Sequence, residues 1–272
     1  MEDPALKPTV CRYEHFEAPW YRRWANHLGI DPSVSIQRQV AYRKVWEWAA
    51  ILEALNSRDM LAPQRRGLGF AVGREPLPSV IASFGCEVVA TDLMPDLVGD
   101  EWAKTGQHSA SLEELYHGQY LPREQFDRLV QFQPVDMNDL SPLNGQYDFI
   151  WSSCAFEHLG SLEAGLHFFE ESMRLLKPGG IAVHTTEINI TSNDDTFETT
   201  HNVLYRKCDM EKLDYRLRKI RCGLEPIDFN AGTHAFDLNY DPEPYFSGSG
   251  IHIKLSLGGY ICTSMLVVGR KG

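Results

Sequence analysis

Short apolar segments alternate with helical ones through the middle of the chain, and several of them end in glycine or an acid. Gly67–Gly73 is a glycine-rich turn, Cys86–Asp92 ends in an acid, and Leu129–Val135 is followed directly by Asp136. Strands that alternate with helices form parallel sheets with right-handed crossovers. Ligands of such open sheets bind beyond the carboxyl ends of the strands. The pattern therefore predicts an α/β fold with a ligand site at that edge.

The other core elements follow in the same order. A helix is predicted from about Pro76 to Phe84, because proline favours the first turn of a helix. A second, amphipathic helix is predicted over Leu162–Leu176. Further strands are expected at residues 148–151, 181–186, 222–229 and 260–268. The expected architecture is a Rossmann-like, seven-stranded, mostly parallel sheet with helices on both faces.

The flanking segments differ from this core. Helical spacing in Ile36–Leu55, together with four tryptophans, predicts an N-terminal helical cap over residues 1–60, which leaves 61–272 as the Rossmann-like domain. Residues 189–218, after the fifth strand, and 230–255, rich in Asp, Tyr, Pro and Gly, are expected to be lid or acceptor segments. Their candidates for acceptor contact are His201, Tyr205, Arg206, Asp237, Tyr240, Asp241 and Tyr245.

The amino-acid composition limits the classes of binding partner to be expected. The chain has 26 Lys+Arg and 37 Asp+Glu, a formal net charge of −11, and no long basic run. This balance argues against nucleic acid and anionic membranes as partners. The six cysteines show no zinc spacing, and neither a signal peptide nor a membrane-length apolar run is evident. We expect a cytoplasmic protein with a small-molecule or saccharide partner; a homo-oligomer remains open.

Two common nucleotide motifs do not fit the glycine-rich turn. The dinucleotide pattern G-x-G-x-x-G/A fails because Val72 and Ala71 stand where it needs a small residue or glycine, and a Walker A sequence is absent. Asp92 follows Gly73 by 19 residues, close to the roughly 20 expected for an acid that binds ribose hydroxyls.

The same residues resemble class I S-adenosylmethionine-dependent methyltransferases. Gly69–Gly73 is similar to the G-x-G-x-G motif of that family, with Ala71 at the middle glycine. Asp92 matches its ribose-binding acid, and Asp136 with Met137 matches its adenine contact. The resemblance covers about residues 65–188 and implies S-adenosylmethionine as cofactor. The implied cofactor-binding residues are Gly69, Ala71, Gly73, Glu75, Asp92, Leu93, Asp136, Met137 and Ser153.

One departure concerns the methionine end of the cofactor. The acid that usually stands two residues before the first glycine is Gly67 here, and nearby Glu75 is the candidate to bind the ammonium instead. Because of Gly67 and Ala71, a cofactor-binding scaffold without turnover remains an alternative. The strings GREPLP, SSCAFEHLGS and HTTEIN also resemble uncharacterised bacterial methyltransferases of glycan or secondary-metabolite assembly.

Candidate catalytic residues follow the fourth and fifth strands. Glu157 and His158 resemble the Glu-His pair of ubiquinone-type and small-RNA O-methyltransferases, some of which bind magnesium through Glu-x-x-Glu-His. Cys154 replaces the first glutamate of that motif, and a thiol is a poor magnesium ligand. Alternatively, Glu157 caps a helix and His158 packs under the cofactor. The catalytic candidates are Glu157, His158 and His184, and a metal such as magnesium would use Glu157, His158, His184 and His252.

These expectations combine into one enzyme hypothesis. The chain is expected to transfer a methyl group from S-adenosylmethionine to a hydroxyl of a small or sugar-like acceptor, with help from a general base or a metal. Besides the scaffold without turnover, a protein or RNA methyltransferase remains an alternative, although the net negative charge disfavours RNA.

Overall fold

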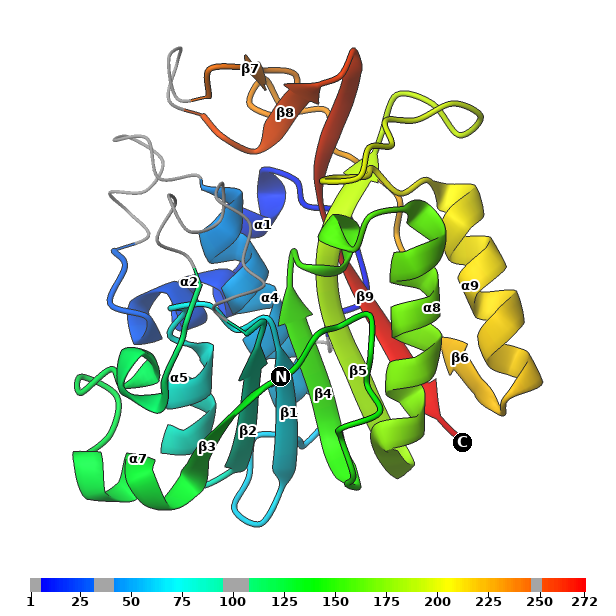
Figure 1. Cartoon of the computed structure of the whole chain (residues 1–272). Coiled ribbons are helices and arrows are strands. Elements are labelled where there is room, and N and C mark those ends of the chain that lie inside the picture. Colours follow the sequence, from blue (N-terminus) through cyan, green and yellow to red (C-terminus); the bar gives the residue numbers. More distant parts are fainter. Residues whose placement is uncertain (1–5, 32–41, 95–107, 246–250) are drawn as a thin grey trace.

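The computed structural model describes residues 6–31, 42–94, 108–245 and 251–272. A nine-stranded sheet runs through it in the order β3-β2-β1-β4-β5-β9-β8-β7, with β6 paired to β9 (Figure 1). The strands are Arg66–Phe70 (β1), Glu87–Asp92 (β2), Val130–Pro134 (β3), Tyr147–Ser153 (β4), Leu176–Asn189 (β5), Cys222–Leu224 (β6), Tyr240–Pro242 (β7), Lys254–Leu257 (β8) and Tyr260–Lys271 (β9).

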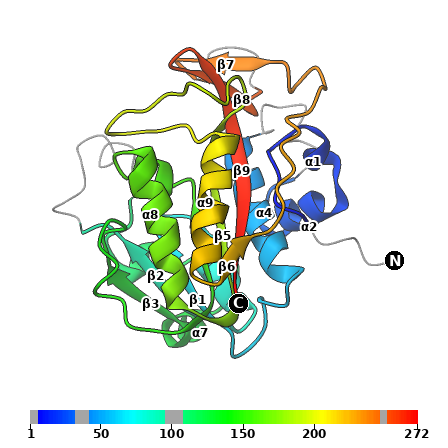
Figure 2. The same ribbon diagram turned by 90° about the vertical axis from the view of Figure 1, so that its right-hand side faces the viewer.

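Helices cover both faces of the sheet. Figure 2 shows α8 and α9 on one side and α1, α2 and α4 on the other. The helices are Glu14–Glu17 (α1), Pro19–His27 (α2), Arg43–Asn56 (α4), Leu77–Ser83 (α5), Arg123–Leu129 (α7), Leu162–Ser172 (α8) and Lys207–Lys219 (α9). Among the described residues, no helix combines the length and apolarity that crossing a bilayer requires.

The five strands from β1 to β5 form a parallel half-sheet. β1 pairs in parallel with β2 on one side and with β4 on the other, so the order of the strands reverses between β1 and β4. Such a reversal opens a crevice at the carboxyl ends of the strands, because the connections on either side lead away from each other. This confirms the expected Rossmann-like α/β architecture and the edge at which a ligand site was expected.

The outer edge of β9 is covered by three separate segments. β6 pairs with its carboxyl-terminal end and β8 with its amino-terminal end. Between them, the Cys11 N–H donates to the Ser264 carbonyl at 2.8 Å, and the Leu266 N–H donates to the Thr9 carbonyl at 2.9 Å. An edge strand with unpaired backbone groups can associate with other chains. Here the backbone groups along most of the outer edge of β9 are paired within the molecule.

The sheet has nine strands, so the expected count of seven was wrong. The two additional strands are β7 and β8, which extend the sheet beyond β9. Each is only three or four residues long and polar at several positions. Alternation over so few residues is too short to distinguish from a loop, which is how this part of the sequence was interpreted. β6 is also shorter than the strand expected over residues 222–229.

The predicted N-terminal cap packs directly on the sheet. Val45, Trp46 and Ala49 of α4 are at most 4% exposed and belong to one apolar cluster with Phe149 of β4 and Val268 of β9. α4 therefore occupies a face of the sheet as a crossover helix would, which places its first turn near the carboxyl ends of β4 and β5. The boundary at residue 60 between the cap and the second domain stays a prediction.

Candidate active site

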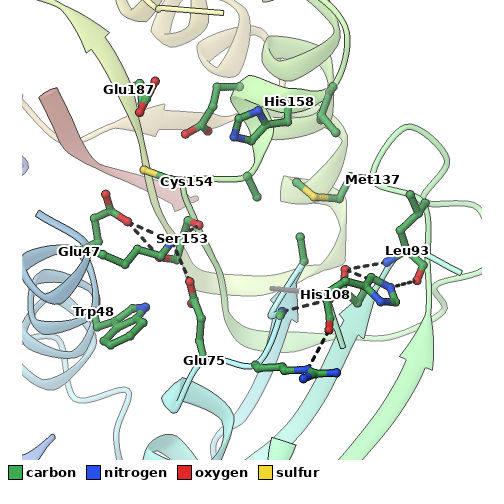
Figure 3. A pocket seen from close by; sticks show the side chains of 18 of the residues that line it. Glu47, Trp48, Glu75, Leu93, His108, Met137, Ser153, Cys154, His158 and Glu187 are labelled. Atoms are coloured by element: carbon green, nitrogen blue, oxygen red, sulfur yellow. Dashed lines mark hydrogen bonds and ion pairs between the residues drawn. The ribbon is translucent and has the colours of Figure 1, made fainter. Parts of the chain in front are cut away.

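A cavity of about 790 Å³ lies at the carboxyl ends of the parallel strands. In Figure 3, Leu93, His108 and Met137 line one side, Glu47, Ser153 and Glu75 another, and His158 and Glu187 a third. This volume is within the range of roughly 300–1,000 Å³ usual for small-molecule sites. The predicted site residues that line it are Ala71, Gly73, Glu75, Asp92, Leu93, Asp136, Met137, Ser153, Glu157, His158 and His252.

The glycine-rich turn after β1 forms the floor of the cavity. Ala71 has φ +45° and Gly73 has φ +53°, a left-handed conformation that glycine adopts without steric cost and alanine does not. Gly69 is part of β1 and does not line the cavity. A Cβ at Gly69 would lie 2.4 Å from the Trp151 ring, so glycine is needed there for packing against β4.

Asp92 ends β2 and orders the loops around it. Its Oδ2 accepts hydrogen bonds from the Gly73 N–H at 3.0 Å and the Ser109 N–H at 3.1 Å, and its Oδ1 accepts one from the Leu93 N–H at 2.8 Å. Burial raises the pKa of this carboxyl group. Oδ2 already accepts two hydrogen bonds, whereas Oδ1 accepts one and keeps a second lone pair, so Asp92 can still accept from a ribose hydroxyl.

Asp136 and Met137 follow β3 on the same side of the cavity. Asp136 Oδ1 accepts a hydrogen bond of 2.8 Å from the Asn138 N–H, which fixes the turn. Met137 is 7% exposed and presents an apolar side chain to the cavity. His108 also lines this side, and its Nε2 lies 2.7 Å from the Leu93 carbonyl oxygen. A carboxylate beside an apolar surface suits a flat base with an exocyclic amine.

A half-buried lysine joins three elements on the opposite side. Lys44, in the first turn of α4, donates from its Nζ to the Ser153 carbonyl at 3.1 Å and to the Ser153 Oγ at 3.0 Å. The same Nζ lies 2.8 Å from Glu75 and 3.2 Å from Glu47. Burial by itself lowers the pKa of Lys44, but the two carboxylates outweigh it and raise the pKa well above its usual value.

Glu157 is completely buried in the wall of the cavity. Its Oε2 accepts a hydrogen bond of 3.0 Å from the Thr186 hydroxyl, and its Oε1 has no partner among the described residues. Its backbone carbonyl accepts from the Val203 N–H at 3.0 Å, which ties the turn after β4 to the segment after β5. Burial, together with the nearby charge of Glu187, raises the pKa of Glu157. A buried carboxylate with a raised pKa is suited to accept a proton.

His158 and Glu187 lie beside Glu157. The His158 Nδ1–H donates to the His201 carbonyl at 2.8 Å, which fixes the orientation of the ring. Glu187 forms an ion pair with Arg43 of α4 and accepts a hydrogen bond of 3.3 Å from Asn202. Burial alone would raise the pKa of Glu187, but the Arg43 guanidinium outweighs it and holds the pKa below its usual value.

His184 does not line the cavity. It is fully buried on the α8 face of the sheet, where its ring centroid lies 4.9 Å from that of Phe169 and 5.8 Å from that of Phe168. Its Nδ1 lies 2.7 Å from the Ser152 hydroxyl oxygen, and burial lowers its pKa to about 3. As a neutral core histidine it contacts neither side of the cavity, so we drop the catalytic and metal-binding roles predicted for His184.

The predicted metal site is not supported. Throughout residues 6–31, 42–94, 108–245 and 251–272, no group of three or more His, Cys, Asp or Glu side chains is arranged to hold a metal ion. His252 lines the cavity, but its Nδ1 lies 2.7 Å from Asp241 Oδ2. We therefore assign no metal-binding role to Glu157, His158, His184 or His252.

The other candidates on the two lid segments have mostly structural contacts. Tyr205 is fully buried and donates from its hydroxyl to the Phe156 carbonyl at 3.2 Å. Arg206 pairs with Asp209 at the start of α9. Asp237 accepts from the Tyr13 N–H at 2.8 Å. Of the candidates proposed for acceptor contact, none lines the cavity, and His201 and Asp241 contact it only through His158 and His252.

The sequence analysis missed the contribution of α4 to this wall. Arg43, Lys44 and Glu47 all line the cavity, although the helix was interpreted only as a packing element. One signal was present. Two cations stand in the first turn of the helix, where the positive end of the helix dipole disfavours them. Such a placement needs compensation from elsewhere, and Glu187, Glu47 and Glu75 supply it.

Comparison with known proteins assigns the central part of this fold. Residues 68–184 match the family model described as a methyltransferase domain. This match and the fold support an S-adenosylmethionine-dependent methyltransferase. No curated protein matches the chain significantly.

Solved structures share the fold of this chain at low sequence identity. A putative sarcosine dimethylglycine methyltransferase from Galdieria sulphuraria has a TM-score of 0.52 and 15% identity, with 84% of each chain covered. An S-adenosylmethionine-dependent methyltransferase from Mesorhizobium loti has a TM-score of 0.50 and 14% identity, covering 80% of this chain and 96% of the other. At such identities the likeness concerns the fold and not the acceptor.

The residues that line the cavity fit S-adenosylmethionine. Asp92 and Asp136 suit ribose hydroxyls and an exocyclic amine, and the backbone turn at Ala71 and Gly73 allows close approach between them. The carboxylates of Glu75 and Glu47 suit an ammonium group. The chemistry of this donor set therefore matches the parts of S-adenosylmethionine along the length of the cavity.

Proposed function

We propose that this protein is an O-methyltransferase that uses Glu157 as general base on a hydroxyl of a small or sugar-like acceptor. The observation that carries the proposal is the buried carboxylate of Glu157, whose Oε1 has no partner among the described residues while Oε2 is held by Thr186. A buried polar atom without a hydrogen-bond partner lowers the stability of the protein. A hydroxyl of the substrate that donates a hydrogen bond to Oε1 therefore gains binding free energy.

When bound, S-adenosylmethionine supplies an activated methyl group for transfer to the acceptor oxygen. Glu157 accepts the hydroxyl proton at Oε1, and its raised pKa makes it a better proton acceptor than an exposed glutamate. His158, oriented by the His201 carbonyl, lies next to Glu157 in the wall and positions the acceptor. Asp92, Asp136 and Glu75 hold the cofactor.

Charge supports a neutral acceptor. The cations that line the cavity are already paired, Arg43 with Glu187, Lys44 with Glu47 and Glu75, and Arg74 with Glu114. A phosphate or carboxylate on the acceptor would have to displace one of these carboxylates. A hydroxyl-rich acceptor instead finds hydrogen-bond acceptors in Glu157 and Glu187.

The proposal is tested with cell extract fractionated by size and charge and incubated with S-adenosylmethionine that carries a deuterated methyl group. Mass spectrometry then follows the label into a product. We expect label in a hydroxyl-bearing small molecule, formed by the wild-type protein and lost with Glu157→Gln. Label on nitrogen would contradict O-methylation, and label on protein or RNA would contradict a small or sugar-like acceptor. Cofactor binding without any product would favour the scaffold.

A further inference from the structure

The position of the family's usual ammonium-binding acid is closed in this protein. Gly67 stands there, on β1, paired with Phe149 of β4. A Cβ at Gly67 would lie 2.3 Å from a ring atom of Phe149, so no carboxylate side chain fits at this position. If this chain binds an amino acid group at all, the acid must come from another element.

Glu75 provides a carboxylate in the cavity wall, but burial works against its charge. Burial raises the pKa of Glu75, and the Lys44 ammonium 2.8 Å away acts in the opposite direction. Lys44 is itself held in place by the carbonyl and hydroxyl of Ser153 at the carboxyl end of β4. Burial outweighs the lysine, so the pKa of Glu75 stays above its ordinary value, but Lys44 limits this rise and fixes the position of the carboxyl group.

The cluster around Lys44 has one cation and two carboxylates, Glu75 and Glu47. Arg43, the neighbouring cation, forms its ion pair with Glu187. The cluster thus has an excess of negative charge inside a cavity wall, where a charge without a partner is unfavourable. A cationic ligand group at Glu75 would complete the pairing, and the ammonium of the methionine half of S-adenosylmethionine is such a group.

We infer that Lys44 of α4 is a positioning residue of the cofactor site, which holds the Glu75 carboxyl group in place against the end of β4 to bind the amino acid half of S-adenosylmethionine. This inference rests on the proposed use of that cofactor and extends the site beyond residues 68–184, the part that matches the methyltransferase family. The first turn of α4 then belongs to the cofactor site, and the cavity is incomplete without it.

Two ligands separate this role from a general effect on folding. S-adenosylhomocysteine carries the amino acid group, and 5′-methylthioadenosine has the same adenosine and a thioether but lacks it. Calorimetry of Lys44→Met should show about tenfold or more weaker binding of S-adenosylhomocysteine, the scale of a lost charge-assisted hydrogen bond, and nearly unchanged binding of methylthioadenosine. Glu75→Gln should show the same pattern. The double variant should bind S-adenosylhomocysteine no more weakly than the single variant with the lower affinity, because the two residues act as a unit.

Lys177→Met is the matched control. Lys177 also pairs with a carboxylate, Asp148, at 2.7 Å, but it does not line the cavity, so both affinities should stay at the wild-type value. Equal losses for both ligands in Lys44→Met, or no loss for S-adenosylhomocysteine, would overturn the inference and leave the proposed function standing. Wild-type protein that binds neither ligand would contradict the proposed function, and the inference with it.

Discussion

The Thr186 hydroxyl and the Glu157 carboxylate are 3.0 Å apart, and this contact holds one carboxylate oxygen while the other has no partner among the described residues. Thr186 belongs to β5 and Glu157 to the 3-10 turn Phe156–His158 after β4. Two neighbouring strands of the sheet therefore orient the same carboxylate in the cavity wall. A group that only capped a helix would not need such an arrangement.

Glu157→Gln removes the proton acceptor and keeps the size of the side chain. We expect kcat to fall by about 10²- to 10⁴-fold, the usual contribution of a general base, with little change in cofactor affinity. Steady-state kinetics with calorimetry of S-adenosylhomocysteine binding tests this. Parallel losses in kcat and in cofactor affinity would show that Glu157 serves only to support the fold. Thr186→Val should give a smaller loss of kcat, because Oε2 then loses its donor.

Asp92→Asn should weaken the adenosine end of the site. The neutral amide keeps one acceptor oxygen for the N–H groups of Gly73, Ser109 and Leu93 but loses the charge. We expect roughly 10- to 100-fold weaker binding of both S-adenosylhomocysteine and methylthioadenosine, because both carry the ribose. Calorimetry measures it. Unchanged affinity for methylthioadenosine would show that the ribose does not bind at Asp92.

His184→Leu tests the assignment of this histidine to the core. Its pKa in the folded protein is about 3, against an ordinary value of 6.5, so between these values the unfolded state binds more protons. Stability should therefore rise with pH in this window, by at most about 1.4 kcal/mol per pH unit from this group. Urea denaturation from pH 4 to pH 7 should give a shallower slope for the variant than for the wild type. An unchanged slope, or a loss of cofactor affinity, would contradict the assignment.

Ala71→Gly should stabilise the turn after β1. Alanine in the left-handed conformation costs about 1–2 kcal/mol, and the greater freedom of glycine in the unfolded chain costs about 0.5–1 kcal/mol. The difference between these ranges is a gain of up to roughly 1.5 kcal/mol, measurable as a higher urea midpoint, with cofactor affinity retained. A lower midpoint would mean that the Ala71 methyl group packs favourably against its surroundings.

Much of the fold, and the edge of the sheet at which the candidate cofactor residues lie, could be predicted because both depend on local pattern. The strand that ends in Asp92 and the strand that precedes Asp136 were recognisable from their apolar runs and the acids after them, and the structure places both acids at one edge of the sheet. The acceptor half depends on contacts between distant segments. The approach of α4 to β4 and β5 is a matter of tertiary packing, which periodicity alone does not encode.

The position of His184, in contrast, could have been predicted correctly from the sequence alone. Residues 184 and 187 differ by an odd number on one strand, and side chains alternate between the two faces. They therefore point to opposite sides, as the contacts of His184 with Phe169 and of Glu187 with Arg43 demonstrate. A residue at the carboxyl end of a strand therefore reaches the cavity only if its side chain points to the face of the sheet on which the cavity opens.

The central claim, that Glu157 is the base of a methyl transfer from S-adenosylmethionine, is tested most directly by one comparison. Wild-type protein and Glu157→Gln are incubated with the deuterated cofactor and the same extract fractions, at concentrations that saturate both with cofactor. The account predicts labelled O-methyl product from the wild type and at least about a hundredfold less from the variant. Equal amounts of product from the two proteins would contradict it.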